Sequence, residues 1–253
     1  MSEFPAMNSE PLFVRSTMDP VGAVLRCIAC WMVLLDFAAA GPAPLSASDY
    51  ATRRIEGWTV RVEKSLDTHP RKAESLKLLK SKLKAVTDAV PPSALPKLRK
   101  VPIWLSRNSA RGAAYHPSAG WLLANGRVVE MERSIEIQNI DDFIDWSAAQ
   151  PMMILHELAH AWHHQVAVDA YENADIKTAY EAAVLSGKYE EVHYYDGRLQ
   201  RHYALTDRME YFAECSEAYF GKNDFQPFKR KALKSFDPQG YRMVRKLWGI
   251  TPP

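Results

Sequence analysis

The run His156-Glu157-Leu158-Ala159-His160 has residue types and a spacing that suit metal-assisted hydrolysis. On a helix, residues four apart lie on the same face, so both imidazoles can bind one tetrahedral metal ion. Glu157 then stands beside the coordination position that remains open, where a carboxylate serves as general base. The run therefore predicts a zinc site with His156 and His160 as ligands and Glu157 as the proton acceptor.

A hydrolytic zinc site needs a third protein ligand, and the sequence offers candidates downstream. The pattern HExxHxxGxxH is excluded, because its glycine and third histidine positions hold His163 and Val166. A carboxylate from a second helix is the other common solution. Three glutamates at helical spacing are candidates: Glu210, Glu214 and Glu217. The alternative is an acidic face exposed to solvent, which the aromatic residues between these glutamates disfavour.

Two blocks, HELAHA and YALTDRMEYFAE, resemble the catalytic domain of anthrax lethal-factor-type zinc metallopeptidases. In that family a tyrosine precedes the ligand glutamate by seven residues, and a Phe-Phe-Ala-Glu-like run follows it. The resemblance implies that Glu210 is the third ligand, that Glu214 holds a ligand histidine, and that Tyr203 faces the reacting carbonyl. The resemblance extends over about residues 100–221, with its specific motifs confined to the two blocks. The sequence departs from the toxin in showing no obvious translocation or receptor-binding domain, so the resemblance does not imply the toxin's substrates.

Other residues near these motifs have both a structural and a functional interpretation. His163 lies one turn beyond His160, where a helix-surface position is favoured over the rim of the site. Cys215 is interpreted as a buried structural thiol rather than a ligand. For His202 a structural role is favoured over contact with substrate. The run 134–138 is either an edge strand that could pair with an extended peptide or an interior strand, and the sequence favours neither interpretation.

These residues require a scaffold of strands followed by helices. The patterns predict a hairpin over 50–66 turning at Glu56-Gly57, a strand over 100–106, and strands at 113–117, 127–131 and 134–138. Helices are expected within 69–90, from Asp141 or Asp142, over 176–186, from about Asp207 and from Lys229, with a hairpin turning at Asp196-Gly197. Pro151 is expected in the first turn of the HELAH helix. The resulting class is α+β and zincin-like: a small twisted sheet packed on the HExxH helix, with a helical C-terminal subdomain.

Composition limits the partners. The chain has 253 residues, with Lys+Arg 32 and Asp+Glu 30, so its net charge of +2 provides no general field for nucleic acid. Its three cysteines build no disulfide framework, because Cys27 and Cys30 lie in the N-terminal apolar segment. We expect a signal peptide or anchor at 1–40, a linker at 41–48 and the catalytic domain at 49–253.

The sequence as a whole predicts a secreted or cell-envelope (periplasmic) zinc metalloendopeptidase that acts on protein or peptide substrates as a monomer. Membrane attachment is expected only if the N-terminal segment is not cleaved. A noncatalytic, zinc-stabilised binding module on the same fold is the alternative. Glu157 and Tyr203 argue against this binding module, because they are groups that a catalytic site needs. A purely structural zinc site normally closes with four protein ligands instead.

Overall fold

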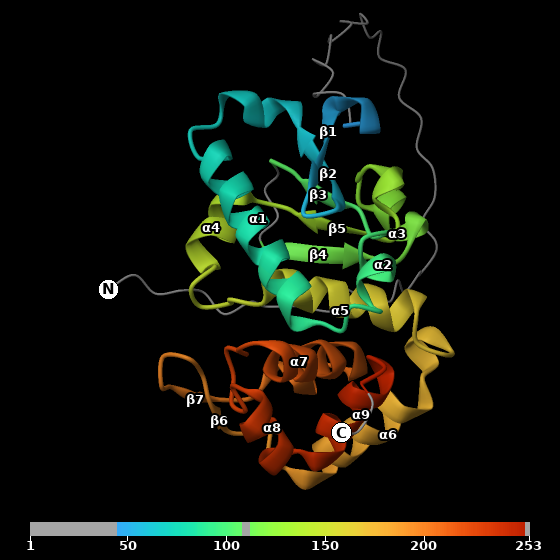
Figure 1. Cartoon of the computed structure of the whole chain (residues 1–253), viewed down its shortest axis with the longest axis vertical. Helices are drawn as coiled ribbons and strands as arrows, with labels where there is room; N and C mark the ends of the chain where they lie inside the picture. Colours follow the sequence, from blue (N-terminus) through green and yellow to red (C-terminus); the bar gives the residue numbers. More distant parts are fainter. Residues whose placement is uncertain (1–44, 108–111, 251–253) are drawn as a thin grey trace, which may run out of the picture. The chain divides into compact units, whose positions relative to one another are not determined.

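The computed structural model describes residues 45–107 and 112–250, which belong to one compact unit. The expected signal peptide or anchor, with Cys27 and Cys30, lies outside the described residues, as does the first part of the expected linker. Over the described ranges the fold is α+β, with a mixed sheet and nine α-helices (Figure 1). None of these described helices combines the length and apolarity that crossing a membrane requires.

The main sheet has five strands in the order β1-β2-β3-β5-β4. Neighbours β2, β3 and β5 run parallel, whereas β1 and β4 pair antiparallel at the two edges. The expected strand at 134–138 is therefore an interior strand, and the edge strand beside it is the one at 113–117. The bounds are β1 (Tyr50–Ile55), β2 (Trp58–Glu63), β3 (Ile103–Leu105), β4 (Ala113–His116) and β5 (Ser134–Ile137).

The β1–β2 turn occurs where the sequence predicts it. Glu56 and Gly57 have φ angles of 50° and 93°, the left-handed conformations that a two-residue hairpin turn with right-handed twist demands. Glycine adopts such angles without steric cost, which explains its place at the second position. A second, two-stranded sheet forms the expected hairpin near Asp196-Gly197, from β6 (Val192–His193) and β7 (Leu199–Gln200).

One face of the main sheet builds the core. Alternate residues of β2, β3 and β5 are completely or almost completely buried there: Val60, Val62, Ile103, Leu105, Ile135 and Ile137. They form one apolar cluster with α1 (Lys72–Ala89) and α5 (Met153–Gln165), to which Leu79, Leu83, Leu155 and Leu158 contribute. The opposite face carries Trp104 in a smaller cluster, covered by α3 (Ala119–Ala124) and the 3-10 turn η3 (Val129–Met131).

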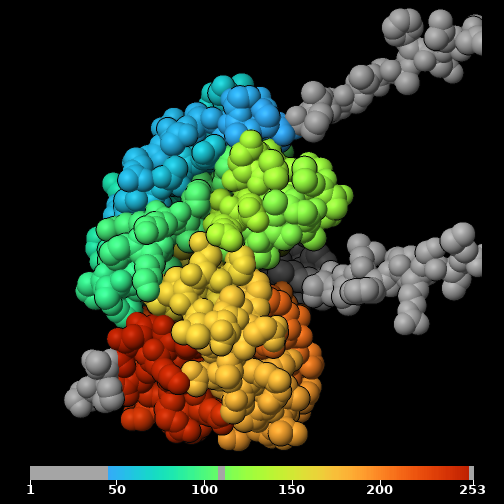
Figure 2. Space-filling view, turned by 90° about the vertical axis from the view of Figure 1, so that its right-hand side faces the viewer, coloured from blue at the N-terminus to red at the C-terminus, as the bar shows by residue number. Residues whose placement is uncertain are grey.

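Helix α5 lies between the sheet and the C-terminal helices. It contacts the edge strand β4 on one side and α7 (Arg208–Phe220) on the other (Figure 1). Around α7 gather α6 (Ala174–Ser186), α8 (Arg230–Phe236) and α9 (Pro238–Leu247). In Figure 2 the blue and green residues of the sheet layer lie above and the red and orange residues of the C-terminal helices below, with yellow residues between them in the centre of the view. The helical C-terminal part expected from the sequence is present.

Three local predictions differ from the structure. The run 127–131 is not a strand, because Val128 and Met131 turn into the small cluster and the chain forms η3 instead. Helix α4 (Ile140–Trp146) is capped by Asn139, which accepts hydrogen bonds from two backbone amides, rather than by Asp141 or Asp142. Pro151 precedes α5, whose first helical residue is Met153. The remaining short helix is α2 (Leu95–Leu98).

Candidate metal centre

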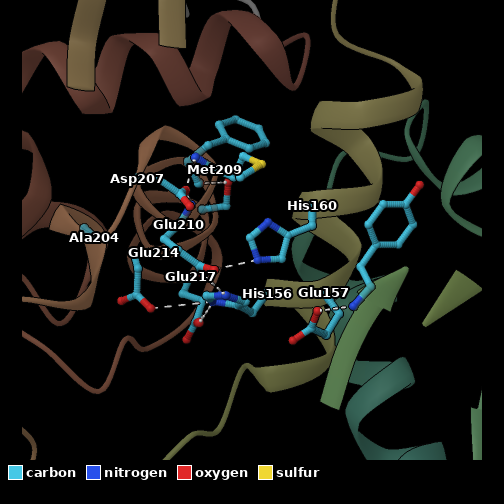
Figure 3. A network of polar contacts seen from close by, with 12 residues as sticks. His156, Glu157, His160, Ala204, Asp207, Met209, Glu210, Glu214 and Glu217 are labelled. Carbon is cyan, nitrogen blue, oxygen red and sulfur yellow. Dashed lines mark hydrogen bonds and ion pairs between the residues drawn. The ribbon is translucent and has the colours of Figure 1, made fainter. Parts of the chain in front are cut away.

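Helix α5 brings the two histidines of the HExxH run to one place. Its start is anchored to α1, because the Lys82 Nζ atom donates to the backbone oxygens of Ser147, at 3.0 Å, and Pro151, at 2.9 Å. The rings of His156 and His160 leave the helix on the same side, with centroids 4.7 Å apart. Both point toward α7, as Figure 3 shows. The helical spacing predicted for this pair is therefore confirmed.

Helix α7 supplies the third group. Its N-terminal cap is Asp207, whose Oδ1 accepts hydrogen bonds from the amides of Met209, at 2.7 Å, and Glu210, at 2.9 Å. This cap fixes the first turn and with it Glu210, whose Oε2 lies 2.9 Å from His156 Nε2 and 3.4 Å from His160 Nε2 (Figure 3). The structure thus brings together the three residues expected as ligands.

The carboxylate of Glu210 and the imidazole of His156 shift each other's pKa values. Burial disfavours the ionised carboxylate of Glu210, but the charge of His160 and the hydrogen bond from His156 outweigh it, so the pKa of Glu210 lies below its ordinary value. Burial likewise lowers the pKa of His156, and the hydrogen bonds to Glu210 and Glu217 more than reverse this effect. The site is a preformed cluster of one carboxylate and two imidazoles.

The donor set fits a zinc ion. The ligand atoms of His156, His160 and Glu210 all lie within 4.8 Å of one another. Two imidazole nitrogens and one carboxylate oxygen are a set that zinc binds in hydrolytic enzymes, where three protein ligands leave one position open. These three residues would therefore hold the ion.

Two further carboxylates lie around the other nitrogen of His156. Glu217 Oε1 is 2.7 Å from His156 Nδ1, whereas the nearest Glu214 oxygen is 3.6 Å away. Glu214 is instead drawn toward Asn223, whose Nδ2 donates to it at 2.7 Å. The carboxylate hydrogen-bonded to His156 Nδ1 is thus Glu217, whereas the resemblance implied that Glu214 holds this histidine. The sequence contains no signal for this choice, since it depends on Asn223 beyond the end of α7.

Glu157 contacts the edge strand β4. Its Oε2 accepts a hydrogen bond of 2.7 Å from the backbone amide of Tyr115 in β4 (Figure 3). The side chain of Tyr115 reaches the end of α5, where its hydroxyl lies 2.8 Å from His164 Nδ1 and accepts from Gln165 Nε2 at 2.9 Å. Tyr115 therefore fixes β4 against α5 and orients the Glu157 carboxylate, a role that the sequence did not indicate.

Tyr203 lies beside His156, with ring centroids 6.4 Å apart. It begins the 3-10 turn η5 (Tyr203–Leu205), whose cap is the side chain of His202, accepting from the Ala204 amide at 3.0 Å. Burial and the negative charge of Glu210 raise the pKa of Tyr203, so its hydroxyl stays protonated and can donate a hydrogen bond. The structure places this tyrosine next to the histidine pair.

The other singled-out residues are all buried. His163 is completely buried rather than on the helix surface, because the chain beyond α5 folds back and packs the Tyr171 ring edge-on against it. His202 packs on Phe225, with ring centroids 4.7 Å apart, and is too buried to touch substrate. Cys215 is 3% exposed, which confirms its prediction as a buried thiol. Of the three, none supplies a ligand atom to the cluster of His156, His160 and Glu210.

Comparisons of the chain with protein-family models, with curated proteins and with solved structures found no match.

Proposed function

We propose that the protein is a zinc-dependent endopeptidase with a zincin-like fold. The observation that carries this proposal is the convergence of His156 Nε2, His160 Nε2 and Glu210 Oε2, with Glu157 one residue along the same helix. The antiparallel edge strand β4 next to this helix also supports it. We further propose that the protein acts as a monomer, outside the cytoplasm.

A zinc ion, when bound, would lower the pKa of a water molecule and polarise the carbonyl of the substrate. Glu157 accepts the proton of the attacking water and passes it to the nitrogen of the leaving amine. Its carboxylate is held for this task at Oε2 by the Tyr115 amide. Orientation by a rigid backbone donor reduces the reorganisation that the reaction would otherwise require.

Tyr203 acts on the developing negative charge. As water adds to the peptide carbonyl, charge accumulates on the carbonyl oxygen, and a preorganised hydrogen-bond donor stabilises it. The protonated hydroxyl of Tyr203, on the His156 side of the site, is such a donor.

The substrate is proposed to be an extended peptide. Strand β4 is bonded to β5 on one side only, so its other side offers backbone groups that can pair with an added strand. Because the Tyr115 amide of this strand already holds Glu157, a peptide lying along β4 would pass directly beside the general base.

The decisive experiment compares the zinc-loaded protein with its Glu157→Gln variant on a diverse peptide library. The proposal expects cleavage by the wild type, loss of cleavage on chelation, and no cleavage by the variant despite about one zinc per chain in elemental analysis. Peptide binding without cleavage by the wild type would favour a zinc-stabilised binding module. Unchanged activity of Glu157→Gln would refute the role of Glu157.

A further inference from the structure

A second tyrosine lies at the other end of the histidine face of α5. Tyr171 belongs to the 3-10 turn η4 (Ala170–Glu172), and its ring stacks on His164 with centroids 4.9 Å apart and planes at 9°. It also meets His163 edge-on at 5.1 Å. The ring is half-buried, and its hydroxyl makes no hydrogen bond with any residue in the described ranges.

The two residues before Tyr171 have an unfavourable backbone conformation. Asp169 and Ala170, directly before it, have φ angles of 60° and 45°. Residues with a Cβ atom rarely adopt the left-handed region, and two in succession persist only where the surroundings impose them. Here the Glu172 amide donates to the Asp169 oxygen at 2.8 Å. Strain of this kind is concentrated at functional sites.

The η4 turn contacts α7 on one side of the candidate site and is connected to α5 and β4 on the other. Glu172 forms an ion pair with Arg208, the first helical residue of α7. On the other side, His164 connects Tyr171 to the Tyr115 hydroxyl, and the Tyr115 amide holds Glu157. Burial raises the pKa of Tyr171, and the nearby Tyr115 and Asp207 add to the effect, so the hydroxyl remains a donor.

The positions of the two tyrosines along α5 suggest what Tyr171 contacts. Tyr203 lies against His156 and Tyr171 against His163, seven residues later on the same helix. Seven helical residues span about 10 Å, which is the length of about three residues of extended peptide. Two tyrosines spaced in this way along α5 are suited to different peptide groups of one bound chain.

We propose that Tyr171 is a substrate-binding residue, whose hydroxyl donates a hydrogen bond to a main-chain carbonyl about three residues from the scissile bond. This inference rests on the proposed function, because it takes the ligand of the site to be an extended peptide. It adds a subsite at the η4 turn that is separate from the reacting groups.

The test measures peptide binding in the zinc-loaded Glu157→Gln background, so that cleavage does not interfere. A labelled peptide that the library identifies is titrated against this parent and against parents carrying Tyr171→Phe or Tyr171→Ala. Loss of one hydrogen bond predicts that Tyr171→Phe weakens binding by about 2- to 13-fold. Tyr171→Ala, which also removes the ring, should weaken it more. Tyr241→Phe, in α9, is the matched control and should bind as the parent does.

Truncated peptides give the distinguishing readout. Peptides shortened progressively from one end should lose their sensitivity to Tyr171→Phe once the contacted residue is removed, whereas a general structural defect would affect every length equally. If the parent binds peptides and Tyr171→Phe binds them equally well, Tyr171 is not a substrate-binding residue and the proposed peptidase is unaffected. If wild type binds but does not cleave, the peptidase proposal fails, and weaker binding by Tyr171→Phe would still identify Tyr171 as a peptide-binding residue. A parent that binds no peptide overturns both.

Discussion

The Nδ1 atom of His156 lies 2.7 Å from the carboxylate of Glu217, two helical turns beyond Glu210, which contacts the opposite nitrogen of the same ring. This imidazole is therefore held from both sides by residues of one helix. A carboxylate on the outer nitrogen fixes the tautomer and raises the basicity of the ligand nitrogen.

We expect Glu217→Gln to weaken zinc binding by about 10- to 100-fold, the usual effect of losing such a partner. Glu214→Gln, a matched change one turn earlier on the same helix, should have a smaller effect, because Glu214 lies 3.6 Å from His156 and bonds to Asn223. Competition against a chromophoric chelator measures both affinities. A larger loss in the Glu214 variant would show that Glu214 supports the histidine in solution.

Tyr203→Phe should reduce kcat by about 100- to 1,000-fold, the usual cost of one lost donor to the developing negative charge. Because Tyr203 is not among the ligands, the zinc content should remain that of wild type. Steady-state kinetics with elemental analysis provides the measurement. A variant that loses its zinc would place Tyr203 in the metal site instead.

Zinc should stabilise the fold, because it binds the preformed cluster of the native state. At a free zinc concentration of 100 times Kd, binding adds about 2.7 kcal/mol to the free energy of unfolding. For a domain of this size, the melting temperature should rise by about 5 to 10 °C. Differential scanning calorimetry with and without chelator tests this expectation. Glu210→Gln should reduce the rise sharply, and an undiminished rise would argue against Glu210 as a ligand.

The stability of the metal-free protein should decrease with acid. The pKa of His163 is about 3 in the folded state, because of burial and the nearby charge of His160, against an ordinary 6.5. Between these values the unfolded chain binds the extra proton, so stability present at neutral pH is lost as pH falls below 6.5. The slope approaches about 1.4 kcal/mol per pH unit.

The matched variant is His163→Phe. Both ring nitrogens of His163 lack hydrogen-bond partners among the described residues, and the ring lies against Tyr171 and Phe212, so phenylalanine loses no hydrogen bond there. Urea unfolding of the metal-free variant between pH 7 and 4 should show a smaller loss of stability than the wild type. Equal slopes for the two proteins would mean that His163 is protonated in the folded state.

The sequence predicts what is periodic and local. Helical spacing predicted that His156 and His160 share a helix face, which the structure shows, and offered Glu210 as one of three candidate partners. The choice of Glu210 among the three came from the family resemblance. Helical spacing could not select between Glu214 and Glu217, because both lie near that face and the choice depends on Asn223, a residue in the following loop. It placed His163 on the surface for a similar reason, because the η4 turn that covers it is set by tertiary packing.

Prediction of the sheet from the sequence is limited for the same reason, because it depends on tertiary packing. The apolar runs at 127–131 and 134–138 are equally short, and such runs do not distinguish a strand from a turn that inserts into a core. Strand order was also inaccessible: β4, not β5, lies at the edge, because β5 pairs with β3 across an intervening segment of chain. The position of β4 as an edge strand next to Glu157 follows from this strand order.

Every residue of α7 from Tyr211 to Phe220 is buried. Because this part of α7 has no solvent-facing side, most substitutions in it would disturb core packing, so the helix that carries Glu210 and Glu217 tolerates little change in sequence. Peripheral segments such as α3, where Trp121 and Leu123 are exposed, tolerate substitution better. For protein engineering, such segments are positions where the sequence can be changed while the cluster of His156, His160 and Glu210 is left intact.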